Sequence, residues 1–268
     1  MTETTEATPK VRLGGMALRN GLLVHGPTHW AAAVRGDDGE IHVASGRKPR
    51  ASAFDGVPGA RGVVRMGEAM AVIPIVRKNL RQARLPFESG SVLGVMAATS
   101  VATQLLRRNP KLRSTTGEAL IAVVGLAPSL FALRSGELAA YHGAEHKAIG
   151  AYEAGDDARE TAKEHDRCGS HLMTPLLALN VAGAGLLRAA VRNPSPAAQA
   201  AVSLASVGAA VEVFAWSERH HDSALARALR VPGHELQRLL GTREPSDRQL
   251  EVGQAALAEI LRVEGAAA

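Results

Sequence analysis

The spacing of hydrophobic and polar residues changes near residue 57, and this change separates two parts of the chain. Before it, short apolar runs alternate with turn residues, a pattern typical of β-strands joined by tight turns. The runs Leu22–His25, His29–Val34 and Ile41–Ala44 predict three strands, with the Gly- and Asp-containing stretch Arg35–Glu40 as a hairpin loop. We therefore expect a small β module in residues 11–56.

After the basic stretch Gly46–Arg50, which we interpret as a linker, apolar positions recur with a helical period from about Gly62 onward. Pro74 lies within the first helical pattern and is expected to bend that helix. Four segments free of Asp, Glu, Lys and Arg follow at Ser89–Leu106, Ala119–Leu133, Leu172–Leu187 and Asn193–Val211. The chain after the β module is therefore predicted to be helical.

An amphipathic helix is predicted near the C-terminus, with Leu250 and Ile260 on its apolar face and Thr242 or Ser246 as its cap. Together these patterns predict an α+β fold that is mainly α, with a small N-terminal β module followed by a helical bundle. The expected divisions are a disordered tail at 1–10, the β module at 11–56, a helical domain at 57–262 and a tail at 263–268. The polar, acidic first ten residues predict no secretory signal.

The four uncharged segments raise the question of a membrane. Spanning a bilayer takes about 17–25 predominantly apolar residues, a length that two of the four segments reach. Small residues dilute all four, as they do both in membrane helix interfaces and in tightly packed soluble bundles. We expect a location at the cell membrane, integral or peripheral, with membrane lipids as partners; a cytoplasmic helical bundle is the alternative.

Composition restricts the partners further. The formal net charge is +5, hydrophobic residues make up 46% of the chain and aromatic residues only 3%. The basic residues lie in short groups beside apolar segments, such as Arg107–Arg113 and Arg188–Arg192, and are not interleaved with aromatic side chains along a groove. This placement favours a membrane surface and argues against nucleic acid.

The strongest chemical signal is the stretch Tyr141–Lys147. His142 and His146 are four residues apart, so on a helix both imidazoles share one face. Glu145 completes the order H-x-x-E-H, which is found in inverted zincins, where the two histidines bind zinc and the glutamate is the general base. The motif predicts Glu145 as a catalytic base beside a metal ion.

A second polar stretch, Glu164–His171, follows closely and contains His165 and the only cysteine, Cys168. A single cysteine excludes an intramolecular disulfide, while its thiolate can bind a metal ion. Imidazole and thiolate ligands suit zinc. We therefore expect His142, His146, His165 and Cys168 to bind a divalent metal ion, with zinc as the best match. The alternative is that the histidines are exposed on a helix and that Cys168 is a small buried apolar residue.

Three further places carry weaker signals. Glu212 ends a long uncharged run, where a carboxylate is a metal ligand, a member of an ion pair or the end of a helix in solvent. The stretch 218–222 resembles a solvated helix end. Arg243 or Glu244 could join a polar site, although packing is the simpler interpretation.

Several ordered motifs resemble those of the YqhQ-like family, a domain-of-unknown-function family of predicted metal-dependent, membrane-associated proteins. They are Gly14–Ala17 with Gly21 and Gly26–Pro27, Tyr141–Lys147, Tyr152–Glu153, His165, Arg167–Gly169, Thr242–Pro245 and Glu251–Val252, and they extend over residues 12 to 262. The chain departs from the usual pattern at Met16 and Asn20, where the family carries Gln and Glu, and at Asp166 and Ser170, where it carries Pro and Thr.

The resemblance implies a metal-dependent enzyme at a membrane, without an assigned substrate, and marks Glu145 and the four expected ligands as the functional set. Two functions follow from the residues. The first is a metal-dependent hydrolase with Glu145 as base, and the second is a membrane-associated scaffold in which the four ligands close a structural metal site. An assembly protein that binds partners without a metal is a third class.

Overall fold

An antiparallel sheet is formed by the first part of the chain. The computed structural model describes residues 10–54, 56–57, 60–112, 114–133 and 136–265. Its strands are β1 (Gly14–Leu18), β2 (Gly21–His25), β3 (His29–Arg35) and β4 (Ile41–Arg47), each paired antiparallel with the next in the order β1-β2-β3-β4.

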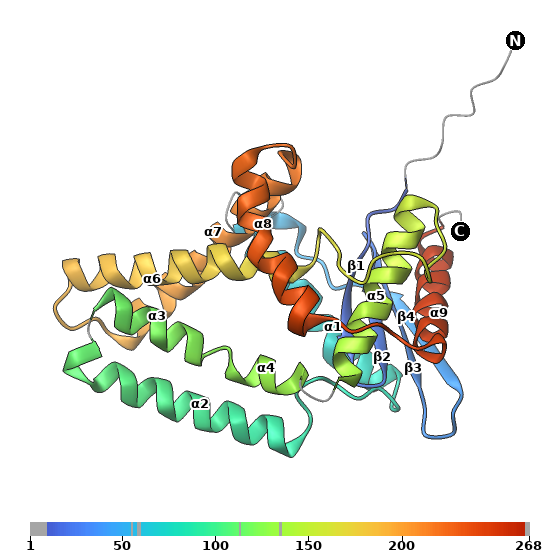
Figure 1. The fold of residues 1–268 in the computed structure, drawn as a ribbon, viewed down its shortest axis with the longest axis horizontal. Helices are drawn as coiled ribbons and strands as arrows, with labels where there is room; N and C mark the ends of the chain where they lie inside the picture. Colours follow the sequence, from blue (N-terminus) through green and yellow to red (C-terminus); the bar gives the residue numbers. More distant parts are fainter. Residues whose placement is uncertain (1–9, 55, 58–59, 113, 134–135, 266–268) are drawn as a thin grey trace, which may run out of the picture.

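Helices make up most of the described chain after the sheet (Figure 1). The α-helices are α1 (Ala60–Asn79), α2 (Gly90–Arg108), α3 (Thr115–Val124), α4 (Ala127–Leu133), α5 (Glu137–Ala154), α6 (Met173–Ala190), α7 (Pro196–Arg219), α8 (Ala224–Leu236) and α9 (Asp247–Glu264). Short helical turns are η1 (Ser52–Phe54), η2 (Pro110–Leu112), η3 (Gly169–Leu172) and η4 (Gln237–Gly241), the last of which is a single π-helical turn. The predicted α+β class, mainly α, is confirmed.

Both faces of the sheet are covered by helices, because successive residues of a strand point to opposite faces. Leu22, Val24 and Ala33 face α5 and α9. Leu23 and Trp30 face α1. On the first of these faces the strands therefore share their core with helices that follow much later in the chain, and the sheet holds α5 in place (Figure 1).

The three predicted strands are present, and two features of the sheet differ from the sequence prediction. Strand β1 was not expected, because Gly14 and Gly15 contribute no side chains to a hydrophobic pattern. Strand β4 continues to Arg47, into the stretch predicted as a linker. The reason is backbone pairing, since Gly46 and Arg47 lie opposite Trp30 and His29 of β3.

The C-terminal helix α9 begins after Ser246, one of the two predicted caps. The Ser246 N–H donates to the Gln249 side chain, as in a capping box. The helix continues to Glu264, two residues into the predicted tail, because the Glu264 carboxylate accepts hydrogen bonds from the backbone N–H groups of Thr28 and His29. Residues 1–9 of the predicted N-terminal tail lie outside the described residues.

Three helical stretches of the described chain are long and apolar enough to cross a membrane. They are Thr116–Leu133, which contains most of α3 and all of α4, Gly169–Ala190, which contains η3 and α6, and Pro196–Arg219, which is α7. Thr116–Leu133 and Gly169–Ala190 extend the predicted segments Ala119–Leu133 and Leu172–Leu187, which were too short to span a bilayer. Helix α2 is not among the three, because Gln104 and the terminal arginines lower its mean hydropathy.

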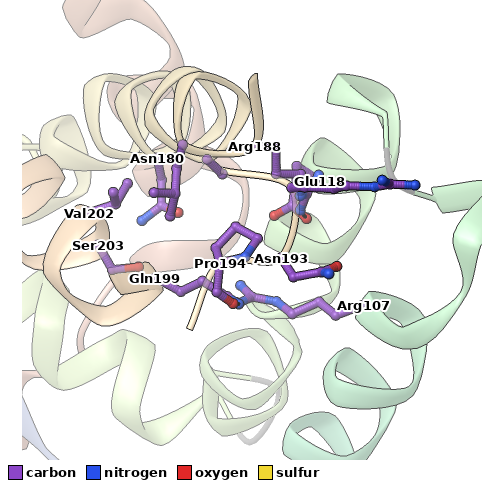
Figure 2. Close-up of a pocket in the computed structure, with 12 residues that line it drawn as sticks. Arg107, Glu118, Asn180, Arg188, Asn193, Pro194, Gln199, Val202 and Ser203 are labelled. Atoms are coloured by element: carbon purple, nitrogen blue, oxygen red, sulfur yellow. Dashed lines mark hydrogen bonds and ion pairs between the residues drawn. The ribbon is translucent and has the colours of Figure 1, made fainter. Parts of the chain in front are cut away.

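A polar cluster joins these helices at one end (Figure 2). The buried Glu118 of α3 pairs with Arg188 of α6, and Arg107 of α2 donates to the Gln199 side chain of α7. These residues line a cavity of about 190 Å³. The basic groups around 107 and 188 therefore lie at the same end of the helices, as a bundle of alternating helices requires.

Candidate metal centre

Helix α5 carries the first half of the predicted site and lies inside the molecule. Its alanine-rich sequence has high helix propensity, and most of its side chains are buried, including Glu145, His146 and Lys147. One face packs on the sheet, and Gly143 lies against the main chain after η4, where a Cβ atom would collide with the Arg243 carbonyl oxygen. The close approach allows the Arg243 N–H to donate to the Ala139 carbonyl oxygen at 2.9 Å.

His142, His146 and Cys168 converge. One potential ligand atom from each lies within 4.8 Å of the other two. The distance from His142 Nε2 to Cys168 Sγ is 3.4 Å, and the two imidazole centroids are 4.3 Å apart. Two ligands bound to one tetrahedral zinc ion at typical Zn–N and Zn–S lengths would lie roughly 3.5 Å apart. The described structure thus contains a three-residue group that could hold a metal ion.

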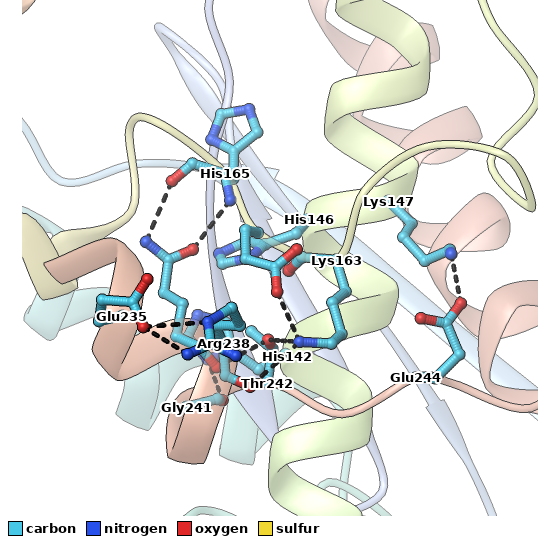
Figure 3. Close-up of polar contacts among 12 residues, drawn as sticks. His142, His146, Lys147, Lys163, His165, Glu235, Arg238, Gly241, Thr242 and Glu244 are labelled. Carbon is cyan, nitrogen blue, oxygen red and sulfur yellow. Dashed lines mark hydrogen bonds and ion pairs between the residues drawn. The ribbon is translucent and has the colours of Figure 1, made fainter. Parts of the chain in front are cut away.

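Backbone carbonyl groups fix the orientation of both imidazoles (Figure 3). His142 Nδ1 lies 2.8 Å from the Gly241 carbonyl oxygen, and His146 Nδ1 lies 2.7 Å from the Lys163 carbonyl oxygen. Since a carbonyl can only accept, each Nδ1 must carry the proton and donate it. In the neutral imidazole this leaves a lone pair on Nε2, which is the arrangement found in metal-binding histidines.

The π-helical turn η4 supplies the Gly241 carbonyl and also Gln237, whose side chain binds the loop that carries Cys168. Gln237, at its start, is fully buried. Its Oε1 accepts the His165 N–H at 2.8 Å, and its Nε2 donates to the Ser170 hydroxyl at 2.8 Å. Gln237 therefore contacts residues on both sides of Cys168. A π-helical turn is rare and is often found at functional sites.

His165 lies beside the cluster, and its ring nitrogens make other contacts. Its ring centroid is 5.6 Å from that of His146. Its Nε2 lies 3.1 Å from the Glu153 carboxylate, while Nδ1 accepts the Arg167 N–H at 3.2 Å. Glu153 also pairs with Arg167. In this arrangement His165 orients the loop that carries Cys168, and its role as a metal ligand stays a prediction.

Glu145 lies within the same site, with one carboxylate oxygen 3.9 Å from His142 Nε2. The carboxylate packs against Gly15 of β1, where a Cβ atom would collide with it. Burial raises the pKa of Glu145 to about 7, with the nearby His142 acting in the opposite direction. A carboxylate with this pKa is suited to accept and release a proton near neutral pH.

Burial also determines the protonation state of two of the candidate ligands, His146 and Cys168. It lowers the pKa of His146 to about 2, with the charge of His142 adding to the effect, so His146 is neutral. It raises the pKa of the Cys168 thiol above its usual value. A divalent cation would reverse the balance at Cys168, because it stabilises the thiolate.

The weaker candidates lie elsewhere or play supporting roles. Glu212 of α7 forms an ion pair with Arg61 of α1 at 2.6 Å and is not part of the three-residue group. Within the stretch 218–222, Glu218 pairs with Arg12. Glu244 pairs with the buried Lys147 of α5 and so helps to hold the segment after η4 against that helix (Figure 3).

An open cavity of about 600 Å³ lies next to the cluster. His142, Glu145, His146 and Cys168 all line it, together with Gly15. The predicted base and the three converging ligand residues are therefore reachable by a bound molecule. The size is within the usual range of ligand-binding pockets.

The sequence did not identify Gln237, the Gly241 and Lys163 carbonyl groups or Gly15 as parts of this site. Backbone carbonyls carry no sequence signal, and a glutamine in a polar stretch is unremarkable. The pair Gly14–Gly15 was visible, but nothing in the sequence shows that β1 lies against Glu145.

Two comparisons with known proteins bear on this site. The family described as "Protein of unknown function (DUF1385)" matches residues 134–263, a range that includes the whole cluster. The "Uncharacterized protein YqhQ" of Bacillus subtilis (strain 168) is 24% identical to this chain over 298 aligned residues, which cover 94% of this chain and 92% of the relative. No solved structure matches the chain.

Proposed function

We propose that this chain, a YqhQ-like protein of a family whose function is unknown, is a metal-dependent hydrolase that works at a membrane. The observation that carries the proposal is the convergence of His142, His146 and Cys168 beside Glu145 in an open cavity. Two imidazoles and one thiolate are three protein ligands, which leaves a coordination position open, as in catalytic zinc sites.

The donor set favours Zn²⁺ over Mg²⁺ or Ca²⁺, since the latter two prefer oxygen ligands. A zinc ion bound there would act as a Lewis acid and lower the pKa of a water molecule. Glu145 would accept the proton of that water, because its carboxylate lies beside the ligands. His142 and His146 would stay oriented through their Nδ1–H bonds to backbone carbonyls.

A structural metal site in a membrane-associated scaffold is the competing interpretation. It requires a fourth ligand to close the shell, and His165 is the predicted one. His165 would have to release both Glu153 and the Arg167 N–H to take part. The contacts of His165 therefore favour an open site.

Location at the cell membrane is part of the proposal. The support comes from the apolar side chains left exposed on the candidate membrane helices, with Val123 58%, Leu186 72% and Leu204 57% exposed. Apolar side chains this exposed, on helices long and apolar enough to cross a membrane, are expected to contact lipid. Extraction of cell membranes at alkaline pH tests it, because an embedded chain stays in the pellet and a soluble bundle does not.

Metal analysis of the purified full chain tests the function. We expect about one zinc ion per chain in the wild type and in Glu145→Gln, and loss of the ion in His146→Ala and Cys168→Ser. Hydrolysis of a p-nitrophenyl ester should require the ion and should be lost in Glu145→Gln. A wild-type chain without metal contradicts the proposal, and a metal-loaded Glu145→Gln variant with full activity contradicts the role of the base.

A further inference from the structure

The cavity beside the candidate metal centre is mainly apolar away from the cluster. Its apolar lining comes from five parts of the chain: β1 with the residue before it, α1, the loop after α1, α4 and α5. The side chains that define this wall are Met70, Ile73, Leu85, Phe87, Leu133 and Ile149. A small polar substrate would make no favourable hydrophobic contact with this apolar wall.

The polar lining is concentrated at the cluster. His142, His146 and Cys168 line the cavity, and they lie close to one another. Away from them, Glu88 is already paired with Arg77 at 3.0 Å. The cavity therefore has a reactive polar region and an apolar region, which matches a molecule with a polar head and a hydrocarbon chain.

The rim of the cavity adjoins one of the candidate membrane helices. Met70 and Phe87 line the cavity and are also exposed on the surface, so part of its edge is apolar. Ala132 and Leu133 of the lining belong to Thr116–Leu133, one of the candidate membrane helices. A lipid could therefore pass its chain from the bilayer into the cavity without exposing the chain to water.

We infer that the cavity binds the hydrocarbon chain of a membrane amphiphile and places its polar head at His142, His146 and Cys168. Because this inference names the substrate class of the proposed hydrolase, it rests on the proposed function for its chemistry, while chain binding is measurable without catalysis. The shared chemistry is a long acyl chain, carried by a phospholipid as the substrate or by a free fatty acid as the product of its hydrolysis.

Photolabelling tests the inference. The full chain is reconstituted in phosphatidylcholine vesicles that contain either palmitic acid or phosphatidylcholine with a diazirine near the end of the acyl chain. After irradiation, labelled peptides are identified by mass spectrometry. We expect label from at least one probe in the peptides that contain Leu85–Phe87 and Ile73, in addition to the lipid-facing label on α6 and α7.

Ile73→Trp is designed to fill the cavity, and Met66→Trp on the same helix is the matched control, since Met66 is exposed and is not part of the lining. Ile73→Trp should lower cavity labelling roughly tenfold, the equivalent of about 1.4 kcal/mol of chain binding. Met66→Trp should leave it unchanged. Equal labelling in the two variants, or label confined to α6 and α7, overturns the inference.

The two proposals fail in different ways. Ile73→Trp should lose cavity labelling and keep its metal ion, whereas His146→Ala should lose the ion and keep cavity labelling. A chain that is labelled in the cavity but never holds metal contradicts the hydrolase and leaves chain binding standing. A metal-loaded chain whose cavity is never labelled contradicts only the inference about the amphiphile.

Discussion

The Nδ1 atom of His142 donates a hydrogen bond to the carbonyl oxygen of Gly241, at a distance of 2.8 Å. The contact links the helix that carries the histidine motif to the π-helical turn η4, 99 positions later in the chain. It fixes which nitrogen of His142 faces Cys168. The orientation of the predicted ligand is therefore set by a residue with no functional side chain.

The close packing of Gly15 against Glu145 leads to a first prediction. Gly15→Ala places a Cβ atom in the position of the Glu145 carboxylate, so the side chain must move, at a cost of about 1–3 kcal/mol. We expect a lower melting temperature with an unchanged metal content, because the ligand residues are not displaced. Gly14→Ala is the matched control, since a Cβ atom there meets no neighbour within 4 Å.

The double variant Gly15→Ala/Glu145→Ala distinguishes this contact from a general weakness of strand β1. Removing the carboxylate removes the collision, so the second substitution should recover part of the stability lost by the first. Strictly additive losses in the two single variants would show that the collision is not the cause.

Gln237 provides a second prediction, because it is buried and holds the backbone and side chains around Cys168. Gln237→Leu leaves the His165 N–H without its acceptor. We expect a loss of about 1–3 kcal/mol in stability and a decrease of roughly 10–100-fold in zinc affinity, measured by competition with a chelator. Gln254→Leu, at an exposed position of α9, should change neither. Wild-type zinc affinity in Gln237→Leu would rule out this supporting role.

A third prediction concerns His25, whose ring nitrogens are buried without a hydrogen-bond partner. Burial, with a smaller contribution from Lys48, lowers the pKa of His25 from 6.5 to about 4. Between these two values the unfolded chain binds the proton more tightly than the folded chain, so stability falls as the pH falls through this window. We expect His25 to account for at most about 2 kcal/mol of the folding stability lost between pH 7 and pH 5.

Melting temperatures of the wild type and His25→Phe, measured from pH 7 to pH 5, test this expectation. The wild type should lose stability more steeply than the variant. His221→Phe, at an exposed position, should follow the wild type. Parallel curves for wild type and His25→Phe would mean that His25 does not contribute to the pH dependence.

The pair formed by Glu118 and Arg188 leads to a fourth prediction. Glu118 is buried between helices, and its removal leaves the arginine charge partly buried without this partner. We expect Glu118→Gln to destabilise the detergent-solubilised chain by about 1–3 kcal/mol, less than for a fully buried pair because Arg188 is 29% exposed in its side chain. The double variant Glu118→Gln/Arg188→Gln should regain part of the loss, and Glu160→Gln at an exposed site should cause none. An unaltered melting temperature in Glu118→Gln would contradict the prediction.

Local patterns were enough to find most of the elements of this fold. The uncharged apolar segments became α2, α3 with α4, α6 and α7, and the alternating runs became β2, β3 and β4. Strand β1 was missed because Gly14 and Gly15 have no side chains through which a strand pattern could show. Its position is decided by pairing with β2 and by the close contact with Glu145.

The sequence by itself determined the helical class, the uncharged apolar helices and the presence of a His, Glu and Cys motif, because periodicity and ligand spacing are local properties of the chain. Only the tertiary structure decided that Cys168 meets His142, that His165 turns to Glu153, and that an apolar cavity adjoins them. The physical reason is that these relationships depend on backbone carbonyls, buried amides and packing between segments far apart in the chain. None of these has a signature in the order of neighbouring residues.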